Sequence, residues 1–385
     1  MTRVAIFGAS GFVGSTLAEE LMADGVDVRC MIHSTGNAWR LARHGIDLKI
    51  CDLMDIESIR TALSGCSHVV NCSRGKGNVM VDGFRNLLTA CREIQPHRFV
   101  HISSVAVYGE VFDSDCISED HPTRPEHGSY GWKKLQQDQM LMKEAQRGLP
   151  AVAICPPNIS GPYSMFCDEI CNNLRSGSFA FVDQGRFPCS LVDVGNLVQA
   201  IRLGLEADVV DGRRVFVCDQ PTETWHRIAT ALARIVGVTE DIPNVSSDEA
   251  KRRVAALTAP SGSTRKTIGH LVSSEVRASL RKDPYIGKLE KLAVGWAKRL
   301  PAAIQDRLRD DVRHIKPAQN SNRSLSVRLM AQQIRNISYD NSLARDCLGY
   351  QPRIDFQSSI ASFERFAELH WGLGSSPFQL LNAHS

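Results

Sequence analysis

The chain of 385 residues is 43% hydrophobic, which is enough to bury a large core in one domain or two. Its 45 basic and 42 acidic residues leave a formal net charge of +3, so no general electrostatic attraction draws it to nucleic acid. No apolar run reaches the roughly 20 residues that span a bilayer, and a strand pattern from Arg3 leaves no room for a secretory leader, so we expect a cytoplasmic protein.

The first half of the chain alternates short apolar runs with patterns typical of amphipathic helices. Such alternation predicts an α/β fold with a doubly wound parallel sheet of the Rossmann type. The predicted strands are residues 3–8, 26–33, 46–51, 67–73, 98–104 and 151–157. The predicted helices are residues 11–25, 58–65, 80–94 and 129–148.

The second half of the chain is less regular. Residues 188–206 are typical of a strand end and a helix that still pack on the sheet, whereas residues 224–237 begin a second region. Residues 246–326 form an insert that is helical in pattern and locally basic, and residues 337–370 return to a short strand and a helix. We therefore predict a sheet domain at residues 1–160 with about 188–206, and a smaller, partly helical C-terminal region at residues 161–187 and 207–385.

The 12 cysteines are scattered, mostly in apolar segments, and none forms a C-x-x-C pair. This usage indicates reduced, buried thiols in a cytosolic protein. Cys167 and Cys171 are four residues apart and could meet on a helix, but no histidine or second cysteine pair accompanies them. We predict no metal site.

A glycine-rich turn follows the first predicted strand. Gly8, Gly11 and Gly14 in GASGFVG stand where this strand meets the first helix. Glycines there permit a tight turn and let backbone amides approach a pyrophosphate, while the helix N-terminus favours negative charge. The motif lies in the first strand–helix unit of an alternating chain, and this context strengthens its interpretation as a dinucleotide site. We predict a dinucleotide site made by Gly8, Ser10, Gly11, Phe12, Val13 and Gly14.

The end of the second predicted strand bears on the choice between NAD and NADP. NAD enzymes carry an acidic residue there, but this strand ends at His33, followed by Ser34 and Thr35. The absence of a carboxylate favours NADP, with His33 as a cofactor contact, although NAD stays open. The arginines near enough in sequence to meet a 2′-phosphate are Arg29, Arg40 and Arg43, and the alternative is that they are solvated helix residues.

The segment after the third predicted strand offers a contact to the adenine. Asp52, followed by Leu53, is placed to accept a hydrogen bond from the adenine amine. In the alternative interpretation, Asp52 and Asp55 are acids at a helix N-terminus. We predict that Asp52 and Leu53 contact the cofactor.

Tyr130 and Lys134 are four residues apart on a predicted helix, so both side chains project from the same face. A phenol with a pKa near 10 is a poor acid or base at neutral pH, but an adjacent ammonium and an oxidised nicotinamide lower that pKa. A decrease of about 3 units requires roughly 4 kcal/mol of preferential stabilisation of the phenolate. We predict that Lys134 supports the phenolate of Tyr130 and also binds the nicotinamide ribose.

The segment HISSVAVYG precedes this helix and ends a predicted strand in two hydroxyls. Ligands of open α/β sheets bind at the carboxyl edge of the strands. Ser104 is therefore placed to hydrogen-bond the substrate oxygen that Tyr130 protonates or deprotonates. The alternative is that Ser103 or Ser104 caps the strand.

Taken together, these segments resemble the extended short-chain dehydrogenase/reductase superfamily, in particular its NAD-dependent epimerase/dehydratase group. The resemblance covers both ends of the chain in the family's order and leaves about residues 246–326 unmatched. The segments that carry it are GASGFVG, CDLMD, VDGFRNLLTAC, HISSVAVYG, YGWKK, PPNISGP, VDVGNLVQAI, ETWHRIATALARIVG and YDNSLARDCLGYQPRIDF.

The resemblance implies a cofactor domain, a smaller C-terminal region that closes over a small-molecule substrate, and catalytic roles for Ser104, Tyr130 and Lys134. It also implies a homodimer through the helices that contain Phe84 and Lys134. The cofactor contacts that it adds are Asn71, Cys72, Ser73, Tyr130, Lys134 and Pro157.

Several positions depart from the family pattern. The strand-end arginine before the Pro-rich turn is Cys155, the position of the usual substrate-diphosphate arginine falls on Cys189, and a frequent asparagine in the fourth helix is Met80. Since a diphosphate needs fixed cationic partners, these changes weaken a sugar-nucleotide assignment. Arg186 is a candidate replacement, although it stands out of register.

Two further residues are candidates for substrate contacts. Arg74 follows the fourth predicted strand and could face an anionic substrate, and the alternative is a solvated loop charge. Asn158 lies in the PPNISGP turn. With Arg186, these residues form the predicted substrate set.

The resemblance predicts an NAD(P)-dependent oxidoreductase or epimerase that transfers a hydride at a hydroxyl-bearing carbon of a sugar-derived or related small molecule. Residues 185–198 are also similar to the branch that oxidises sterol-like or lipid-like hydroxyls, which is the main alternative. Dehydration ranks lower, because no Asp-Glu pair follows Ser104. A non-catalytic dinucleotide sensor is a further alternative.

Residues 284–300 of the insert place apolar side chains on one helical stripe and basic residues largely elsewhere. Such a helix could make a peripheral contact with an anionic membrane surface. The other interpretation, which we favour, is a lid helix packed on the substrate region, because the chain offers no second anchoring signal.

Overall fold

The computed structural model describes residues 2–35, 38–42, 45–208, 211–239, 241–258 and 325–371. The chain divides into two compact units, residues 1–251 with 325–385, and residues 252–324. The second unit lies almost wholly outside the described residues, and so does the predicted amphipathic helix at 284–300.

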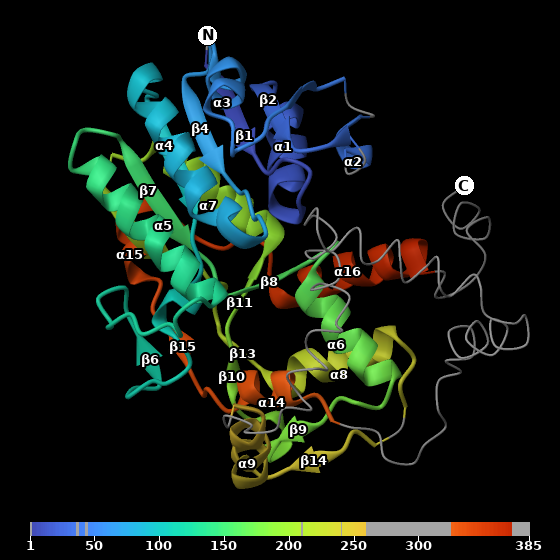
Figure 1. The fold of residues 1–385 in the computed structure, drawn as a ribbon. Coiled ribbons are helices and arrows are strands. Elements are labelled where there is room, and N and C mark those ends of the chain that lie inside the picture. Colours follow the sequence, from blue (N-terminus) through green and yellow to red (C-terminus); the bar gives the residue numbers. More distant parts are fainter. Residues whose placement is uncertain are drawn as a thin grey trace, which may run out of the picture. The chain divides into compact units, whose positions relative to one another are not determined.

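The centre of the first unit is a seven-stranded parallel sheet in the order β12-β7-β5-β4-β1-β2-β3. Figure 1 shows β7, β4, β1 and β2 in this order. The chain order reverses at β1, which pairs with β2 on one side and β4 on the other. The predicted doubly wound sheet is therefore confirmed. The strands are β1 (Arg3–Phe7), β2 (Asp27–Ile32), β3 (Asp47–Ile50), β4 (His68–Asn71), β5 (Arg98–Ile102), β7 (Ala151–Cys155) and β12 (Asp211–Phe216).

Helices cover both faces of the sheet, because side chains alternate between the faces along each strand. On β1, Val4 and Ile6 join a core with α1, α7 and α15, while Ala5 and Phe7 join a core with α3, α4 and α5. These helices are α1 (Phe12–Ala23), α3 (Ile56–Leu63), α4 (Asp82–Ile94), α5 (Tyr130–Ala145), α7 (Val194–Glu206) and α15 (Ser342–Leu348).

β12 is a strand that the sequence did not predict. Its residues fall in the range 207–385, which was assigned to the C-terminal region, yet it pairs in parallel with β7 at the edge of the sheet. The register places Arg214 opposite Ala153 and Phe216 opposite Cys155. A basic residue, Arg214, is thereby brought beside the middle of β7.

A smaller, partly helical region surrounds a separate core that contains Trp225 and Phe363. Its short strands pair two by two, β8 with β11, β9 with β14, and β10 with β13. The strands are β8 (Asn158–Ser160), β9 (Phe181–Val182), β10 (Pro188–Cys189), β11 (Leu191–Asp193), β13 (Glu223–Thr224) and β14 (Asn244–Val245). The helices are α6 (Met165–Arg175), α8 (Trp225–Ile235), α9 (Ser247–Thr258), α14 (Val327–Gln333) and α16 (Phe356–Trp371).

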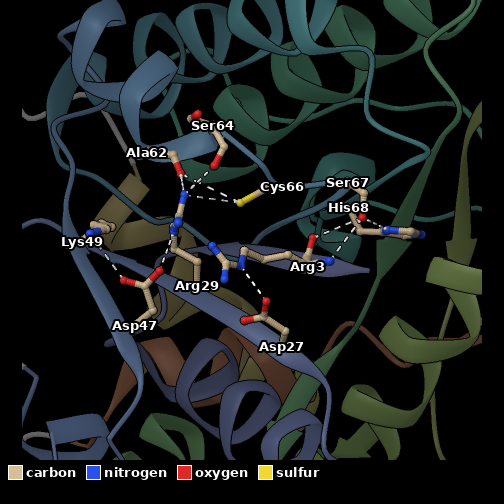
Figure 2. A network of polar contacts seen from close by, with 10 residues as sticks. All are labelled: Arg3, Asp27, Arg29, Asp47, Lys49, Ala62, Ser64, Cys66, Ser67 and His68. Carbon is tan, nitrogen blue, oxygen red and sulfur yellow. Dashed lines mark hydrogen bonds and ion pairs between the residues drawn. The ribbon is translucent and has the colours of Figure 1, made fainter. Parts of the chain in front are cut away.

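A polar network fixes β2 against its neighbours (Figure 2). Arg29, only 9% exposed, pairs with Asp47 of β3 at 2.7 Å and donates to the carbonyl oxygens of Ala62 and Ser64 near the end of α3. These partners take up hydrogen-bond donors of the Arg29 guanidinium. Arg29 is therefore not a candidate for a 2′-phosphate contact, because a strand–helix network holds its charge.

Candidate active site

The predicted glycine turn joins β1 to α1 through backbone contacts that leave no room for a side chain. Gly8 has a φ of +75°, and a Cβ there would lie 2.7 Å from the backbone of Ser73. At Gly14 a Cβ would lie 2.9 Å from the Cα of Ala9, so only glycine lets α1 pack this closely on the turn. Gly11 is the N-cap of α1 and no side chain caps it, which leaves the first amides of the helix for an anion.

The end of β4 lies directly beside this turn. The buried side chain of Asn71 accepts hydrogen bonds from the backbone N–H and the hydroxyl of Ser73, at 3.1 and 2.6 Å. Its Nδ2 lies 3.1 Å from Nδ1 of His101. Asn71 thus shapes the turn, and the backbone of Cys72 and Ser73 borders the space in front of Gly8.

Three basic residues near the end of β2 and in or after α2 (Trp39–Ala42) were candidates for a cofactor contact. His33 is exposed at the carboxyl end of β2. Arg40 is 8% exposed, pairs with Glu19 of α1 at 2.5 Å and stacks on the ring of Tyr163. Arg40 is therefore not a solvated helix residue. Arg43 lies outside the described residues.

The segment after β3 contains Asp52 and Leu53, which were predicted to contact the cofactor. The alternative placed Asp52 and Asp55 at a helix N-terminus. Asp52 accepts a hydrogen bond from the backbone of Met54 at 2.9 Å, so it stabilises its own turn. Asp55, rather than Asp52, is the N-cap of α3. Leu53 packs against Gly83 at the start of α4. A Cβ added to Gly83 would lie 2.8 Å from the Cβ of Leu53.

The start of α5 is pressed against the short helix η3 (Val105–Tyr108). Ser129 caps α5 by accepting from the backbone of Trp132. At Gly131 a Cβ would collide with the carbonyl group of Ala106. Glycine after Tyr130 therefore permits the close approach that brings Tyr130 to the strand end at Ser104.

The side chain of Ser104 lies close enough to the phenol of Tyr130 to lower its pKa. Ser104 is also the N-cap of η3 and accepts a hydrogen bond from the backbone of Ala106 at 3.3 Å. Desolvation raises the pKa of Tyr130, while the charge of Arg74 and the nearby Ser104 side chain lower it. The Cζ of Arg74 lies 4.9 Å from the centre of the tyrosine ring.

Lys134 lies one turn after Tyr130 and is 3% exposed. Its ammonium donates to the carbonyl oxygen of Ile102 at 2.7 Å, which fixes it under the end of β5. Burial lowers the pKa of Lys134 to about 8, and the negative charge of Asp138 opposes that decrease.

Asp138 lies a further turn along α5 and is 1% exposed. It accepts a hydrogen bond from the hydroxyl of Ser103 at 2.7 Å, and His101 lies 3.8 Å from its other oxygen. Burial raises the pKa of Asp138 to about 6, against the Ser103 hydrogen bond and the charges of Arg214 and Lys134. Sequence reasoning missed Asp138, although its spacing of four residues from Lys134 could have indicated it.

Arg214 supplies a cation for this buried acid from β12. One of its nitrogens lies 3.6 Å from Asp138, and its Nε donates to the hydroxyl of Tyr108 at 3.1 Å. The position where the resemblance places an arginine is the buried Cys155 on β7. The positive charge therefore reaches Asp138 from the neighbouring strand.

The predicted substrate residues are not all brought together. Pro157 and Asn158 line a cavity of about 40 Å³ with Cys189, whose sulfur lies 3.9 Å from the amide of Asn158. Arg186 does not line it, but is exposed and pairs with Asp183 at 3.3 Å. The cation in the cavity wall is Arg335, which the sequence analysis missed.

A model of the NAD-dependent epimerase/dehydratase family matches residues 4–218. The chain belongs to this family. Since the family consists of enzymes that use a nicotinamide cofactor, the predicted family and enzyme class are confirmed.

Two proteins to which the chain is similar are reductases. The chain is 25% identical to a 4-hydroxy-2-methyl-3-oxo-4-farnesyl-3,4-dihydroquinoline-1-oxide ketoreductase of Stigmatella aurantiaca, over 65% of this chain and 78% of the relative. It is 30% identical to cinnamoyl-CoA reductase 1 of Oryza sativa subsp. japonica, over 41% of this chain and 54% of that protein. The second match therefore spans about half of the relative's length.

Two solved epimerase structures share the fold of this family member. UDP-glucose 4-epimerase of Thermotoga maritima, with UDP-glucose, gives a TM-score of 0.66 at 15% identity, over 96% of this chain and 100% of that one. UDP-glucuronic acid 4-epimerase of Bacillus cereus, in complex with NAD, gives a TM-score of 0.63 at 16% identity, over 96% and 98%.

Two further features are absent from the described ranges. No helix there is both long and apolar enough to cross a bilayer. Within the same ranges, no three His, Cys, Asp or Glu residues are grouped as ligands of a metal ion.

Proposed function

We propose that this enzyme transfers a hydride between a nicotinamide dinucleotide and a hydroxyl-bearing carbon of a small molecule, with Tyr130 as the acid/base group. The observation that carries the proposal is the approach of the Tyr130 phenol to Ser104, one helical turn from the buried Lys134. A proton donor and the hydroxyl that orients the reacting oxygen thus stand side by side.

Each residue has a defined task in this proposal. Tyr130 holds or releases the proton at its phenol oxygen, Ser104 orients the substrate oxygen, and Lys134 supplies positive charge and a donor to the ribose. The bound nicotinamide supplies or accepts the hydride. The residues proposed to hold the cofactor are Gly8, Ser10, Gly11, Phe12, Val13, Gly14, His33, Asp52, Leu53, Asn71, Cys72, Ser73 and Pro157.

We propose NADP as the preferred cofactor, with NAD as the alternative that the NAD-bound relative supports. NADP is favoured because the carboxyl end of β2, at His33, offers no carboxylate to bind an adenosine ribose or repel a 2′-phosphate. Calorimetric titration of the purified protein with NADP⁺ and NAD⁺ tests the preference. Tighter binding of NAD⁺ would contradict it.

For the reaction, we propose net oxidation or reduction of a largely apolar molecule, the sterol-like or lipid-like alternative. The buried Cys155 and Cys189 stand where a sugar-nucleotide enzyme is expected to carry arginines. Epimerisation of a sugar-derived substrate is the second candidate, supported by the likeness to UDP-sugar epimerases.

Two measurements test the reaction. Nicotinamide absorbance is followed with a panel of alcohols, ketones and sugar nucleotides, with Tyr130→Phe as the control. Native mass spectrometry of fresh protein then separates the candidates, because an epimerase returns the hydride and retains its cofactor, whereas a dehydrogenase exchanges it. Cofactor binding without turnover of any compound in the panel would favour the non-catalytic sensor.

We also propose a homodimer through α4 and α5, and a division into a cofactor domain and a substrate region in which β12 belongs with the cofactor sheet. α4 and α5 pack together and are joined by an ion pair between Arg92 and Glu144. Light scattering coupled to gel filtration tests the dimer. A monomer at all concentrations would contradict it.

A further inference from the structure

An arginine lies over the ring of the proposed acid/base tyrosine. The Cζ of Arg74 is 4.9 Å from the centre of the Tyr130 ring, which is within the range of a cation–π contact. Tyr130 is 37% exposed and Arg74 is exposed as well, so the contact lies at the surface of the protein. In the part of the chain that the structure describes, no hydrogen bond or ion pair engages the guanidinium. Arg74 therefore keeps its full positive charge beside the tyrosine.

The backbone on both sides of Arg74 is held in place. Before it, the backbone N–H of Ser73 donates to the buried side chain of Asn71 at 3.1 Å. After it, a Cβ added at Gly75 would lie 2.5 Å from Cγ1 of Val79, so glycine permits the close packing there. The loop that carries the arginine is therefore fixed on both sides, which limits the positions that the side chain can reach and favours its contact with the ring.

The charge of Arg74 affects how easily the phenol ionises. Burial raises the pKa of Tyr130, and the charge of Arg74 is the strongest of the influences that lower it. Burial lowers the pKa of Lys134, and the charge of Arg74 lowers it further, so both titrating groups at the start of α5 respond to this cation. The ammonium of Lys134 is meanwhile bound to the carbonyl oxygen of Ile102 at 2.7 Å. Arg74 thus supplements a cation that is anchored to the strand.

The other ionisable groups near Tyr130, among the described residues, lie on α5 and β7. Lys134 and Asp138 are buried on the same helix and carry opposite charges. Cys155 on β7 is neutral, because burial raises the pKa of its thiol well above the usual value. Arg74 is the exposed charge in this set. Salt therefore screens Arg74 strongly and leaves the buried pair much less affected.

We propose that Arg74 is a second cation of the acid/base site, which stabilises the phenolate of Tyr130 across the face of its ring. The inference rests on the proposed function, because Arg74 has this task only if Tyr130 exchanges a proton with the substrate. In alcohol oxidation the phenolate accepts the proton of the substrate hydroxyl, while the hydride passes to the nicotinamide. Arg74 is a positioning residue in this step: it takes no proton itself, but increases the fraction of Tyr130 that is ready to accept one.

An ultraviolet titration of the phenolate tests the inference without a substrate. The protein is saturated with NADP⁺ and its tyrosinate absorbance is followed against pH, with the same protein carrying Tyr130→Phe as the reference that isolates this tyrosine. We expect the midpoint to move to higher pH in Arg74→Met, because the cation that favours the phenolate is lost. Arg74→Lys should give an intermediate midpoint, since it keeps the charge but not the planar group that stacks on the ring. An unchanged midpoint in Arg74→Met would overturn the inference.

A matched control and a salt series separate this contact from the general charge of the loop. Lys76→Met removes an exposed base of the same loop and should leave the midpoint of Tyr130 unchanged. Between about 0.01 M and 1 M ionic strength the Debye length shortens from about 30 Å to about 3 Å. The midpoint of the parent should therefore rise with salt, and that of Arg74→Met should rise much less. Equal salt dependence in these two proteins, or equal shifts in Lys76→Met and Arg74→Met, would contradict the inference.

Kinetics distinguishes this role from substrate binding. At pH values below the midpoint, Arg74→Met should lower kcat/KM for oxidation of an uncharged alcohol about two- to fivefold, the contribution of a cation over a partly exposed ring. A loss confined to substrates that carry an anionic group, with an unmoved titration, would overturn the inference and assign Arg74 to substrate binding. Hydride transfer that requires Tyr130 while the titration is unmoved in Arg74→Met defeats this inference alone, whereas a shifted titration without hydride transfer with any compound defeats the proposed function.

Discussion

Arg214 on β12 lies 3.6 Å from the carboxylate of Asp138 on α5, the helix that also carries Tyr130 and Lys134. The carboxylate is 1% exposed, so its charge depends on partners within the protein. The strand-end position that a family arginine would occupy is Cys155, one strand away. The cation near Asp138 therefore comes from Arg214 on β12 and not from the strand-end position on β7.

Replacing Arg214 with leucine should lower the free energy of unfolding by about 3 kcal/mol, because it leaves a buried carboxylate without its cation. Urea denaturation at neutral pH measures the loss. Arg213→Leu is the matched control, since this neighbour makes only an exposed ion pair with Asp211 and should cost less than about 1 kcal/mol. If both variants lose the same free energy, the Arg214–Asp138 pair has no special role. Asp138→Asn should restore part of the stability of Arg214→Leu.

Asp138→Asn should shift the pH dependence of catalysis. Burial lowers the pKa of Lys134 to about 8 and the charge of Asp138 opposes this, so removing that charge lowers the pKa further. Lys134 then loses its proton at a lower pH, and the alkaline limb of the kcat/KM profile should move in the same direction. The control is Asp82→Asn, an exposed acid on α4, whose profile should match the parent. An unchanged alkaline limb in Asp138→Asn would mean that the protonation of Lys134 does not control kcat/KM.

The same variant should alter the pH dependence of stability. The folded state raises the pKa of Asp138 from 3.8 to about 6, mainly through burial, so folded protein holds a proton that unfolded protein has lost. The contribution of this group to the free energy of unfolding therefore decreases as pH rises through that window. Asp138→Asn should remove the decrease, which denaturation midpoints at the two ends of the window would reveal. If the free energy of unfolding depends on pH with the same slope in Asp138→Asn and in the parent, the group that holds the extra proton in the folded state is not Asp138.

The sheet and its glycine turn were predictable from sequence because their signals are local. Gly8 and Gly14 occupy the turn between adjacent elements, and alternation along β1 predicts which side chains face each helix layer. β12 was missed for a physical reason. An edge strand that exposes Asp211 and Arg213 lacks the continuous apolar run of a central strand.

The site was predictable only in part. Ser104, Tyr130 and Lys134 lie on two consecutive segments whose pattern and spacing indicate their roles. Arg214 and Arg335 come from distant segments, and nothing in their local sequence distinguishes them from solvated charges. Tertiary structure alone brings them to Asp138 and to the cavity.

Tyr130→Phe should lower turnover by about two to four orders of magnitude and leave cofactor affinity nearly intact, since only the proton donor is lost. Lys134→Met should impair both, because the proposed ribose donor is lost as well. Steady-state kinetics and calorimetric cofactor titration measure the two effects. Equal turnover in Tyr130→Phe and the parent would remove the mechanism.

Gly131→Ala tests the contact that positions Tyr130. A Cβ there would collide with the carbonyl group of Ala106, a backbone atom that cannot move aside as a flexible side chain can. The start of α5 must therefore move away from η3, which should separate the phenol of Tyr130 from Ser104. We expect turnover to fall about a hundredfold with cofactor affinity nearly unchanged, because the glycine turn at Gly8 lies in another element. Gly204→Ala is the control, since the new methyl meets side chains at 3.3 Å or more, and it should retain most turnover. If Gly131→Ala keeps full turnover, Tyr130 does not depend on η3 for its position, and the pairing with Ser104 is not what makes it act.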